Sequence, residues 1–300
     1  MYRYIRVNLA LRIVFYTSLL LIVLGILVIW QSLKFSKTKL IFCDVGQGDA
    51  ILLSLGTKQV LVDGGQGSRV LECLGDRLPF WDRTVEMVVL THPQRDHMEG
   101  LIAVLERYGV ERIITTGVKA DTDVFRAWEA AVKSEGAVVH TTNLGEKFVI
   151  DRGRALTMTV LWPAKAAIGQ WKINPPKDLN ESSIVMRLDF ADPSTHSVRS
   201  GQLCAYLTGD IPREILEGLI DRQCEILKIA HHGSRTGTSL EILEKAKPKI
   251  AVIQSGKNSY GHPHKEVLDL LESHGVKILR NDLIGMVEIV DNGRSLVTVD

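Results

Sequence analysis

The stretch Thr91–His97, THPQRDH, brings two histidines and an aspartate, His92, Asp96 and His97, within six residues. It follows the apolar run EMVVL (Glu86–Leu90), which has the length of a β-strand, and it precedes a helical pattern. The three side chains are therefore expected together on a loop between a strand and a helix. Loops at strand ends commonly carry function, and clustered imidazole and carboxylate groups can ligate a metal.

Three further strand ends carry the same chemistry. Asp63 ends the run QVLVD, Asp210 follows AYLTG, and the pair HH at 231–232 follows EILKIA. Six of the nine histidines lie in such loops after strands: His92, His97, His231, His232, His262 and His264. A strand-end aspartate also fits a turn or a helix cap, but capping explains neither the His-Asp-His cluster nor two adjacent histidines. The pattern therefore favours metal ligation.

Short apolar runs punctuated by glycine and aspartate continue after Lys39 and predict strands, some in direct succession and some followed by helices. Helical periodicity recurs near residues 100–108, 123–134, 213–221, 240–247 and 265–273. This mixture predicts an α/β sandwich of four layers, in which helices cover the outside of two sheets. The segment Ala167–Asn180 has the weakest pattern and is expected to be a loop.

The N-terminal segment predicts a membrane anchor. Residues 13–30, IVFYTSLLLIVLGILVIW, contain no charge, and at about 1.5 Å per residue they nearly span a hydrocarbon core of about 30 Å. We expect a transmembrane helix over about residues 12–30, an anchor of residues 1–38 and a globular domain of residues 39–300. A signal peptide is the alternative, but its apolar region is usually shorter and ends in small residues. Three basic residues flank the segment on each side, so the positive-inside rule predicts no orientation.

The basic residues are unevenly distributed. Of the 36 lysines and arginines, six lie in residues 1–39, a segment without acids. Residues 40–300 therefore hold 30 basic and 35 acidic side chains. This excess of acid argues against binding of nucleic acid by bulk positive charge alone, although bound divalent cations would offset it.

The four cysteines, Cys43, Cys73, Cys204 and Cys224, lie among apolar residues and form no C-x-x-C pair. Neither a zinc knuckle nor a small disulfide scaffold is indicated. We expect buried thiols, with pairing as the alternative in an oxidising compartment.

Seven motifs, in this order, resemble the metallo-β-lactamase superfamily and, more narrowly, the hydrolase domain of ComEC competence proteins. They are DVGQGD (Asp44–Asp49), LVDGG (Leu61–Gly65), THPQRDH (Thr91–His97), NESS (Asn180–Ser183), LTGD (Leu207–Asp210), KIAHHGS (Lys228–Ser234) and YGHPH (Tyr260–His264). The resemblance covers residues 39–300. It implies the four-layered αββα sandwich of that superfamily, preceded here by one transmembrane helix.

The resemblance also implies one or two divalent metal ions, zinc or manganese. Asp96 and His97 would bind one ion and His92 the other, with Asp210 between or beside them. Either His231 or His232 would complete the set, since adjacent residues of a strand point to opposite sides, and the sequence leaves open which one it is. The catalytic candidates are Asp96, Asp210 and His232. The residues that would support the ligands or contact the substrate are Asp44, Asp49, Asp63, Gln94, Asn180, Ser234, Lys257, Asn258, His262 and His264. Among them, Asp63 would orient the loop of His92.

Gln94 departs from the motif. The superfamily signature is H-x-H-x-D-H, and the ComEC-like branch commonly has an acid where this chain has Gln94. An amide oxygen is a weaker ligand than a carboxylate, so the metal site nearer His92 is expected to be loosely occupied or to need a particular metal. The sequence lacks the membrane-channel region and accessory domain of ComEC proteins, and we do not expect DNA import by this chain alone.

Metal-assisted hydrolysis is the activity that these residues favour. A phosphodiester is the preferred substrate, because two metals can hold the attacking and leaving oxygens of an in-line displacement. The polar stretch SGKNSYGHPH (Ser255–His264) would supply phosphate contacts, although it is also typical of an ordinary turn. The resemblance implies a nuclease on the outer face of the cytoplasmic membrane, with DNA, the membrane and components of a DNA-uptake machinery as partners. The alternatives are a hydrolase of a small phosphoester, a lactone or a β-lactam, and a non-catalytic binding protein with a degenerate metal site.

Overall fold

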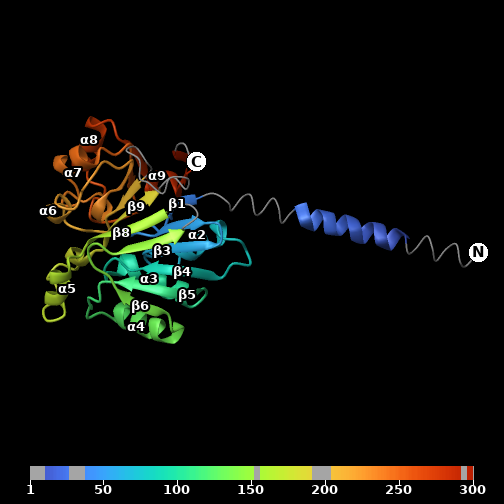
Figure 1. The fold of residues 1–300 in the computed structure, drawn as a ribbon. Helices are drawn as coiled ribbons and strands as arrows, with labels where there is room; N and C mark the ends of the chain where they lie inside the picture. The colour runs from blue at the N-terminus through green and yellow to red at the C-terminus, as the bar shows by residue number, and fades with distance from the viewer. Residues whose placement is uncertain (1–10, 27–37, 152–155, 191–203, 292–295, 300) are drawn as a thin grey trace, which may run out of the picture.

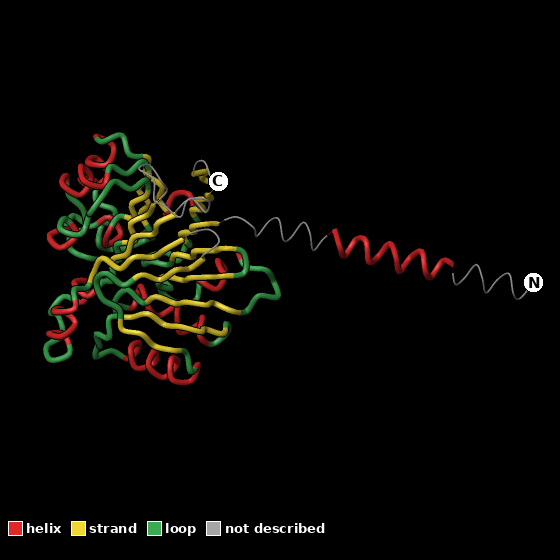
Figure 2. The backbone as a smooth tube through the Cα atoms, in the orientation of Figure 1, coloured by secondary structure: helices red, strands yellow, loops and turns green. Residues whose placement is uncertain are grey.

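Two β-sheets packed face to face form the centre of the protein (Figures 1 and 2). The computed structural model describes residues 11–26, 38–151, 156–190, 204–291 and 296–299. The strand order is β15-β14-β1-β2-β3-β4-β5-β6 in the first sheet and β13-β12-β11-β10-β9-β8-β7 in the second. The strands are β1 (Thr38–Phe42), β2 (Ile51–Leu55), β3 (Lys58–Val62), β4 (Thr84–Val89), β5 (Gly109–Thr115), β6 (Val138–Thr141), β7 (Lys147–Asp151), β8 (Leu156–Trp162), β9 (Val185–Phe190), β10 (Cys204–Leu207), β11 (Ile226–Lys228), β12 (Ile250–Ile253), β13 (Lys277–Arg280), β14 (Val287–Asp291) and β15 (Leu296–Val299).

Helices cover the outer face of each sheet, as predicted. The helices α2 (Val70–Arg77), α3 (Arg95–Leu105) and α4 (Asp123–Glu135) pack on the first sheet. The helices α6 (Arg213–Leu216), α7 (Leu240–Ala246) and α8 (Lys265–Ser273) pack on the second. The remaining short elements are α5 (Lys165–Trp171), α9 (Asn281–Ile284) and the 3₁₀ helices η1 (Leu179–Ser182) and η2 (Ala230–Gly233). The arrangement is therefore a two-sheet α/β sandwich with outer helical layers.

The central strands, such as β1, β2 and β10, are apolar on both faces because both faces of each sheet are covered there. In β1 and the residue after it, Leu40 and Phe42 pack between the two sheets, whereas Ile41 and Cys43 pack beneath the helices. The alternation of side chains along a strand assigns them to these two cores. This double burial explains why the sequence shows continuous apolar runs rather than alternating polar and apolar residues.

The predicted transmembrane helix of about residues 12–30 lies only partly within the described residues. A helix covers residues 11–26, and its large apolar side chains are exposed, from 44% for Val23 to 68% for Leu21. Residues 27–30 lie outside the described residues. No helix in the described part of the chain is both long and apolar enough to cross a membrane.

The expectation of free thiols was wrong, because all four cysteines are paired. Cys43, after β1, is bonded to Cys73 in α2, and Cys204, at the start of β10, is bonded to Cys224 just before β11. The Cα atoms of the two pairs are 5.8 and 5.1 Å apart, within the range for disulfides. Each bond joins residues that are distant in sequence but adjacent in the fold.

Two helical segments also differ from the sequence-based expectation. The segment expected to be a loop, Ala167–Asn180, contains most of α5 and the start of η1. Alanine and glutamine in KAAIGQW favour a helix, and the prolines that follow prevent its extension. Helix α2 was not predicted, because Gly75 interrupts a segment of only eight residues.

Candidate metal centre

The predicted metal-binding residues meet at one edge of the sandwich. Strands β3 and β4 run parallel and end shortly before Asp63 and His92. Strands β10 and β11 also run parallel, and they end shortly before Asp210 and the HHGS turn. The carboxyl ends of these strands therefore lie at the same edge, and α3 begins there with Asp96 and His97 in its first turn.

Asp63 joins the residues of the THPQRDH loop. One of its buried carboxylate oxygens accepts hydrogen bonds from Thr91 Oγ1 (2.7 Å) and His97 Nδ1 (2.8 Å), and the other accepts one from Thr91 N (2.8 Å). Thr91 Oγ1 lies 3.0 Å from His92 Nδ1. Because this hydroxyl donates its hydrogen to Asp63, it accepts one from His92. Both histidines thus have Nδ1 occupied and present Nε2 to the site, and Asp63 orients the loop.

His231 and His232 do not lie on a strand. They form a turn with φ angles of 52° and 54°, in the left-handed region that residues other than glycine rarely adopt. The expectation of strand alternation was therefore wrong. His232 is buried and donates from Nδ1 to Gln254 O (2.8 Å), whereas His231 is half-buried, with Nε2 4.0 Å from Asp210 Oδ2. The geometry makes His232 the inner histidine of the two.

Asp210 occupies the centre of the cluster. Its Oδ2 lies 3.3 Å from His97 Nε2 and 3.2 Å from His232 Nε2. Its backbone N–H donates to Ser183 Oγ (3.1 Å). Within the described residues, four sets of possible ligands have their donor atoms within 4.8 Å of one another: His92, His97 and Asp210; Asp96, His97 and His232; Asp49, Asp210 and His232; and Asp49, Asp63 and His97.

The donor atoms of this cluster fit a divalent cation. Within the described residues, Nε2 of His92, His97 and His232 and Oδ1 of Asp210 are buried and have no hydrogen-bond partner. A buried polar atom without a partner costs about 1–3 kcal/mol. Imidazole nitrogen and carboxylate oxygen bind zinc and manganese alike. A cation would satisfy these atoms, and their hydrogen-bonded neighbours already fix the orientation of the rings.

Burial and the buried carboxylates set the protonation of the histidines. Burial and the neighbouring His97 lower the pKa of His92 to about 3, so that this ring is neutral near pH 7. Burial also disfavours the charged forms of His97 and His232. The nearby carboxylates, above all that of Asp210, outweigh burial and raise the pKa of both rings well above that of a free histidine. Burial would raise the pKa of Asp210, but His232 and His97 hold it well below its usual value. The buried carboxylates thus stabilise positive charge at this point, on the histidine rings or on a cation that replaces their protons.

Lys228 and Asp49 form a fully buried ion pair beside this cluster. Lys228 Nζ contacts Asp49 Oδ2, lies 3.5 Å from Asp210 Oδ1 and donates to Gly209 O at 2.8 Å. Asp49 Oδ1 lies 3.3 Å from His232 Nδ1. Asp49, which was predicted to support the ligands or to contact the substrate, thus lies within the cluster. Lys228 was missed, although a lysine within the apolar run EILKIA was a signal, since lysine is almost never fully buried without a partner.

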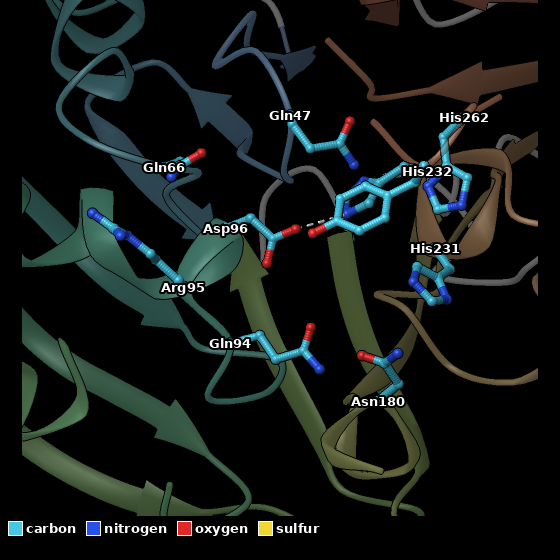
Figure 3. Close-up of a pocket in the computed structure, with 10 residues that line it drawn as sticks. Gln47, Gln66, Gln94, Arg95, Asp96, Asn180, His231, His232 and His262 are labelled. Carbon is cyan, nitrogen blue, oxygen red and sulfur yellow. Dashed lines mark ion pairs between the residues drawn. The ribbon is translucent and has the colours of Figure 1, made fainter. Parts of the chain in front are cut away.

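A pocket of about 380 Å³ opens onto the cluster (Figure 3). The predicted residues that line it are Gln94, Asp96, Asn180, His231, His232 and His262. Gln47, Gln66, Arg95 and Tyr260 also line it and were not predicted, although Gln47, Arg95 and Tyr260 belong to the motifs DVGQGD, THPQRDH and YGHPH. Figure 3 shows the amides of Gln94 and Asn180 on the same side of the pocket. Asn180 Oδ1 is buried without a hydrogen-bond partner in the described residues, and the site thus has further oxygen donors.

Replacement of Gln94 by aspartate is expected to raise the affinity of the site for manganese. Gln94 caps the N-terminus of α3 with its backbone and lines the pocket, where a carboxylate would be a stronger ligand for a hard cation than an amide. Titration calorimetry on the metal-free full chain measures the change, and Gln66→Asp, at another position lining the pocket, is the control for added charge. Equal gains in the two variants would mean that Gln94 has no special position toward the cation.

Five predicted residues belong neither to the buried cluster nor to the lining of the pocket: Asp44, Ser234, Lys257, Asn258 and His264. Asn258 holds its own loop together, since its amide donates to Gly256 O and His262 O, and its oxygen accepts from the backbone N–H groups of Tyr260 and His262. The expected phosphate contact of Asn258 is therefore replaced by a structural role. The other four are placed elsewhere as follows: Asp44 is exposed and accepts from Gly46 N, Ser234 contacts Thr236, Lys257 is exposed, and the ring of His264 lies 4.9 Å from that of His262.

Comparison with known proteins gives partial matches to competence proteins. No protein-family model matches the sequence. The chain is 28% identical over 212 residues to ComE operon protein 3 of Bacillus subtilis, a match that covers 69% of this chain and 24% of that protein. It is 25% identical over 219 residues to Recombination protein 2 of Haemophilus influenzae, covering 71% of this chain and 23% of that protein. The chain thus spans about a quarter of the length of these relatives.

Among solved structures, a mutant of the CmlA β-hydroxylase has the same fold. It superposes with a TM-score of 0.51 at 13% sequence identity, over 85% of this chain and 54% of that chain. At this identity the likeness concerns the fold alone.

Proposed function

We propose that this chain, a relative of the ComEC-type competence proteins with the metallo-β-lactamase fold, is a metal-dependent phosphodiesterase that acts on DNA close to a membrane. The observation that supports it best is a set of four buried atoms, three imidazole nitrogens and one carboxylate oxygen, that form no hydrogen bond within the described residues. They lie next to a polar pocket that His232 lines. No serine or cysteine nucleophile is required for this chemistry.

The residues of the chain have distinct roles in this proposal. His92, His97, His232, Asp96 and Asp210 hold one or two divalent cations, zinc or manganese. When bound, such a cation would lower the pKa of a coordinated water to about 7 and polarise a phosphoryl oxygen. Asp63 and Gln254 keep the rings of His97 and His232 in place through their Nδ1 atoms. The side chains of Asn180 and Arg95 line the pocket and can donate hydrogen bonds to phosphate oxygens.

Membrane anchoring through residues 1–38 and an extracytoplasmic domain of residues 39–300 are part of the proposal. The exposed apolar side chains of the helix over residues 11–26 favour an apolar environment. Two disulfides favour an oxidising compartment, because thiols in the cytosol are kept reduced. DNA and components of a DNA-uptake machinery are the proposed partners, by analogy with the competence proteins.

Degradation of DNA by the full chain in detergent tests this function. After chelation, manganese or zinc should restore cleavage of single- or double-stranded DNA, and His97→Ala should lose it, because His97 Nε2 belongs to the unpartnered donor set. His274→Ala, an exposed histidine at the end of α8, is the matched control and should keep the activity of the parent protein. Comparison of the cleavage rates of single- and double-stranded DNA in the same experiment shows which form of DNA is preferred.

Absence of cleavage with either metal would contradict the nuclease proposal. Bound-metal content then separates the alternatives, since a hydrolase of a small phosphoester or lactone would still bind metal, whereas a degenerate binding protein would not.

A further inference from the structure

The connection between α2 and β4 presents two aromatic side chains to solvent. Asp82 N donates to Pro79 O (2.8 Å), so Phe80 and Trp81 occupy the two central positions of a turn. Phe80 is 77% exposed and Trp81 54% exposed, and their rings contact each other edge to face, with centroids 4.8 Å apart. A pair of large aromatic side chains in this position is costly in water, because both leave most of their apolar surface hydrated.

Hydrogen bonds hold this turn and direct its one acid inward. Asp82 accepts hydrogen bonds from Thr84 N (3.1 Å) and Gln59 Nε2 (3.4 Å), and Gly109 N donates to Arg83 O (2.8 Å). The exposure of the aromatic pair is thus a property of an ordered turn. With the carboxylate of Asp82 engaged, the tip of the turn is apolar.

The turn lies at the edge of the first sheet where the chain enters the domain. Thr38, the first residue of β1, pairs with Leu55 at the end of β2, next to Gly56. Gln59 Nε2 donates both to Gly56 O (3.3 Å) and to Asp82, and so links this edge to the aromatic turn. Figure 1 shows the connection between α2 and β4 on the side of the domain where β1 begins. Thr38 and the aromatic turn therefore lie at the same end of the strands of this sheet.

The metal centre lies at the opposite end of the strands of the same sheet. The aromatic turn precedes β4, and His92 follows it. Six residues of β4 at about 3.3 Å per residue separate the two ends by about 20 Å. A surface that received the aromatic turn would leave the pocket facing away from it.

We propose that the Phe80–Trp81 turn inserts into the interfacial layer of a lipid bilayer and holds the domain on the membrane with its pocket toward the aqueous phase. Phenylalanine and tryptophan are typical of this layer, and the apolar helix over residues 11–26 is joined to Thr38 by eleven residues that reach at most about 40 Å. The proposal rests on the membrane anchoring proposed above and adds a second contact, which fixes the orientation of the domain.

Quenching of tryptophan fluorescence by brominated lipids tests the contact. The full chain is reconstituted in vesicles of phosphatidylethanolamine and phosphatidylglycerol with brominated acyl chains, in a Trp30→Phe background that removes the tryptophan next to the apolar helix. Trp81→Phe should then remove most of the remaining quenching. Trp171→Phe should not change it, because Trp171 contacts Trp162, with ring centroids 6.1 Å apart, at the end of β8 in the second sheet.

Flotation with the vesicles separates this inference from the anchoring itself. If the protein floats and Trp81→Phe leaves the quenching unchanged, the domain does not contact the membrane through this turn, and anchoring still holds. If the protein does not float, both the anchoring and the contact are overturned.

Discussion

Replacement of Asp210 by asparagine is expected to remove bound metal and to reduce hydrolysis by at least about 100-fold. Asp210 Oδ2 lies within 3.3 Å of Nε2 of both His97 and His232, and Asp210 belongs to two of the four sets of converging donors. Loss of a residue that only supports a metal ligand already costs about 10–100-fold in affinity or activity. Removal of the central charge should therefore cost no less, although asparagine keeps the shape of the side chain.

The metal content of the purified variant is the primary measurement, because it does not depend on the identity of the substrate. Far-UV circular dichroism should remain that of the parent protein. Asp44→Asn is the matched control, because it removes the same charge from a loop near the site. Asp44 is exposed, and within the described residues its carboxylate accepts a hydrogen bond only from Gly46 N. Parent-like metal content in Asp210→Asn would remove Asp210 from the metal centre.

The position of the candidate site could be predicted from the sequence because its residues follow strands. Residues after Val62, Val89 and Leu207 were expected at strand ends, and parallel strands bring their carboxyl ends to one edge. The apolar runs also predicted the two covered sheets. These inferences needed only the local pattern and the geometry of strands.

The sequence could not predict features that depend on contacts between distant segments. The partners of Cys43 and Cys204 depend on which helix and strand pack beside them, and the helix that carries Cys73 was itself missed. Asn258 was expected to face a substrate because its neighbours are polar, but its own loop uses all its hydrogen-bonding groups. His231 and His232 form a left-handed turn where a strand was expected. Positive φ is typical of glycine, and the glycine of this motif comes only after them, at 233.

The burial of Lys228 follows from a requirement for charge balance. The side chains of Asp49, Asp63 and Asp210 are at most 1% exposed. A buried carboxylate without a partner is strongly unfavourable. Lys228 is 0% exposed and contacts Asp49 directly. Burial alone would lower the pKa of Lys228, but Asp49 and Asp210 outweigh burial and raise it, so the side chain stays charged. The ammonium group therefore stabilises the carboxylates before any cation is bound.

Lys228→Met is accordingly expected to lower the free energy of unfolding of the metal-free protein by about 3–5 kcal/mol, the usual cost of removing one partner from a buried ion pair. Urea unfolding in the presence of a chelator measures this loss. Lys249→Met is the control, because Lys249 forms its ion pair with Glu225 with 78% of its side chain exposed, where such pairs contribute about 0–1 kcal/mol.

A second substitution separates the charge from the packing of the lysine side chain. In Lys228→Met/Asp49→Asn the carboxylate that lost its partner is also neutral, so the double variant should recover a large part of the stability lost by Lys228→Met. Saturating manganese should also stabilise Lys228→Met more than the parent protein, since a cation compensates the same carboxylates. If the losses in free energy of unfolding from the two substitutions were instead additive, Lys228 would stabilise the protein through packing, and Asp49 would not depend on the charge of Lys228.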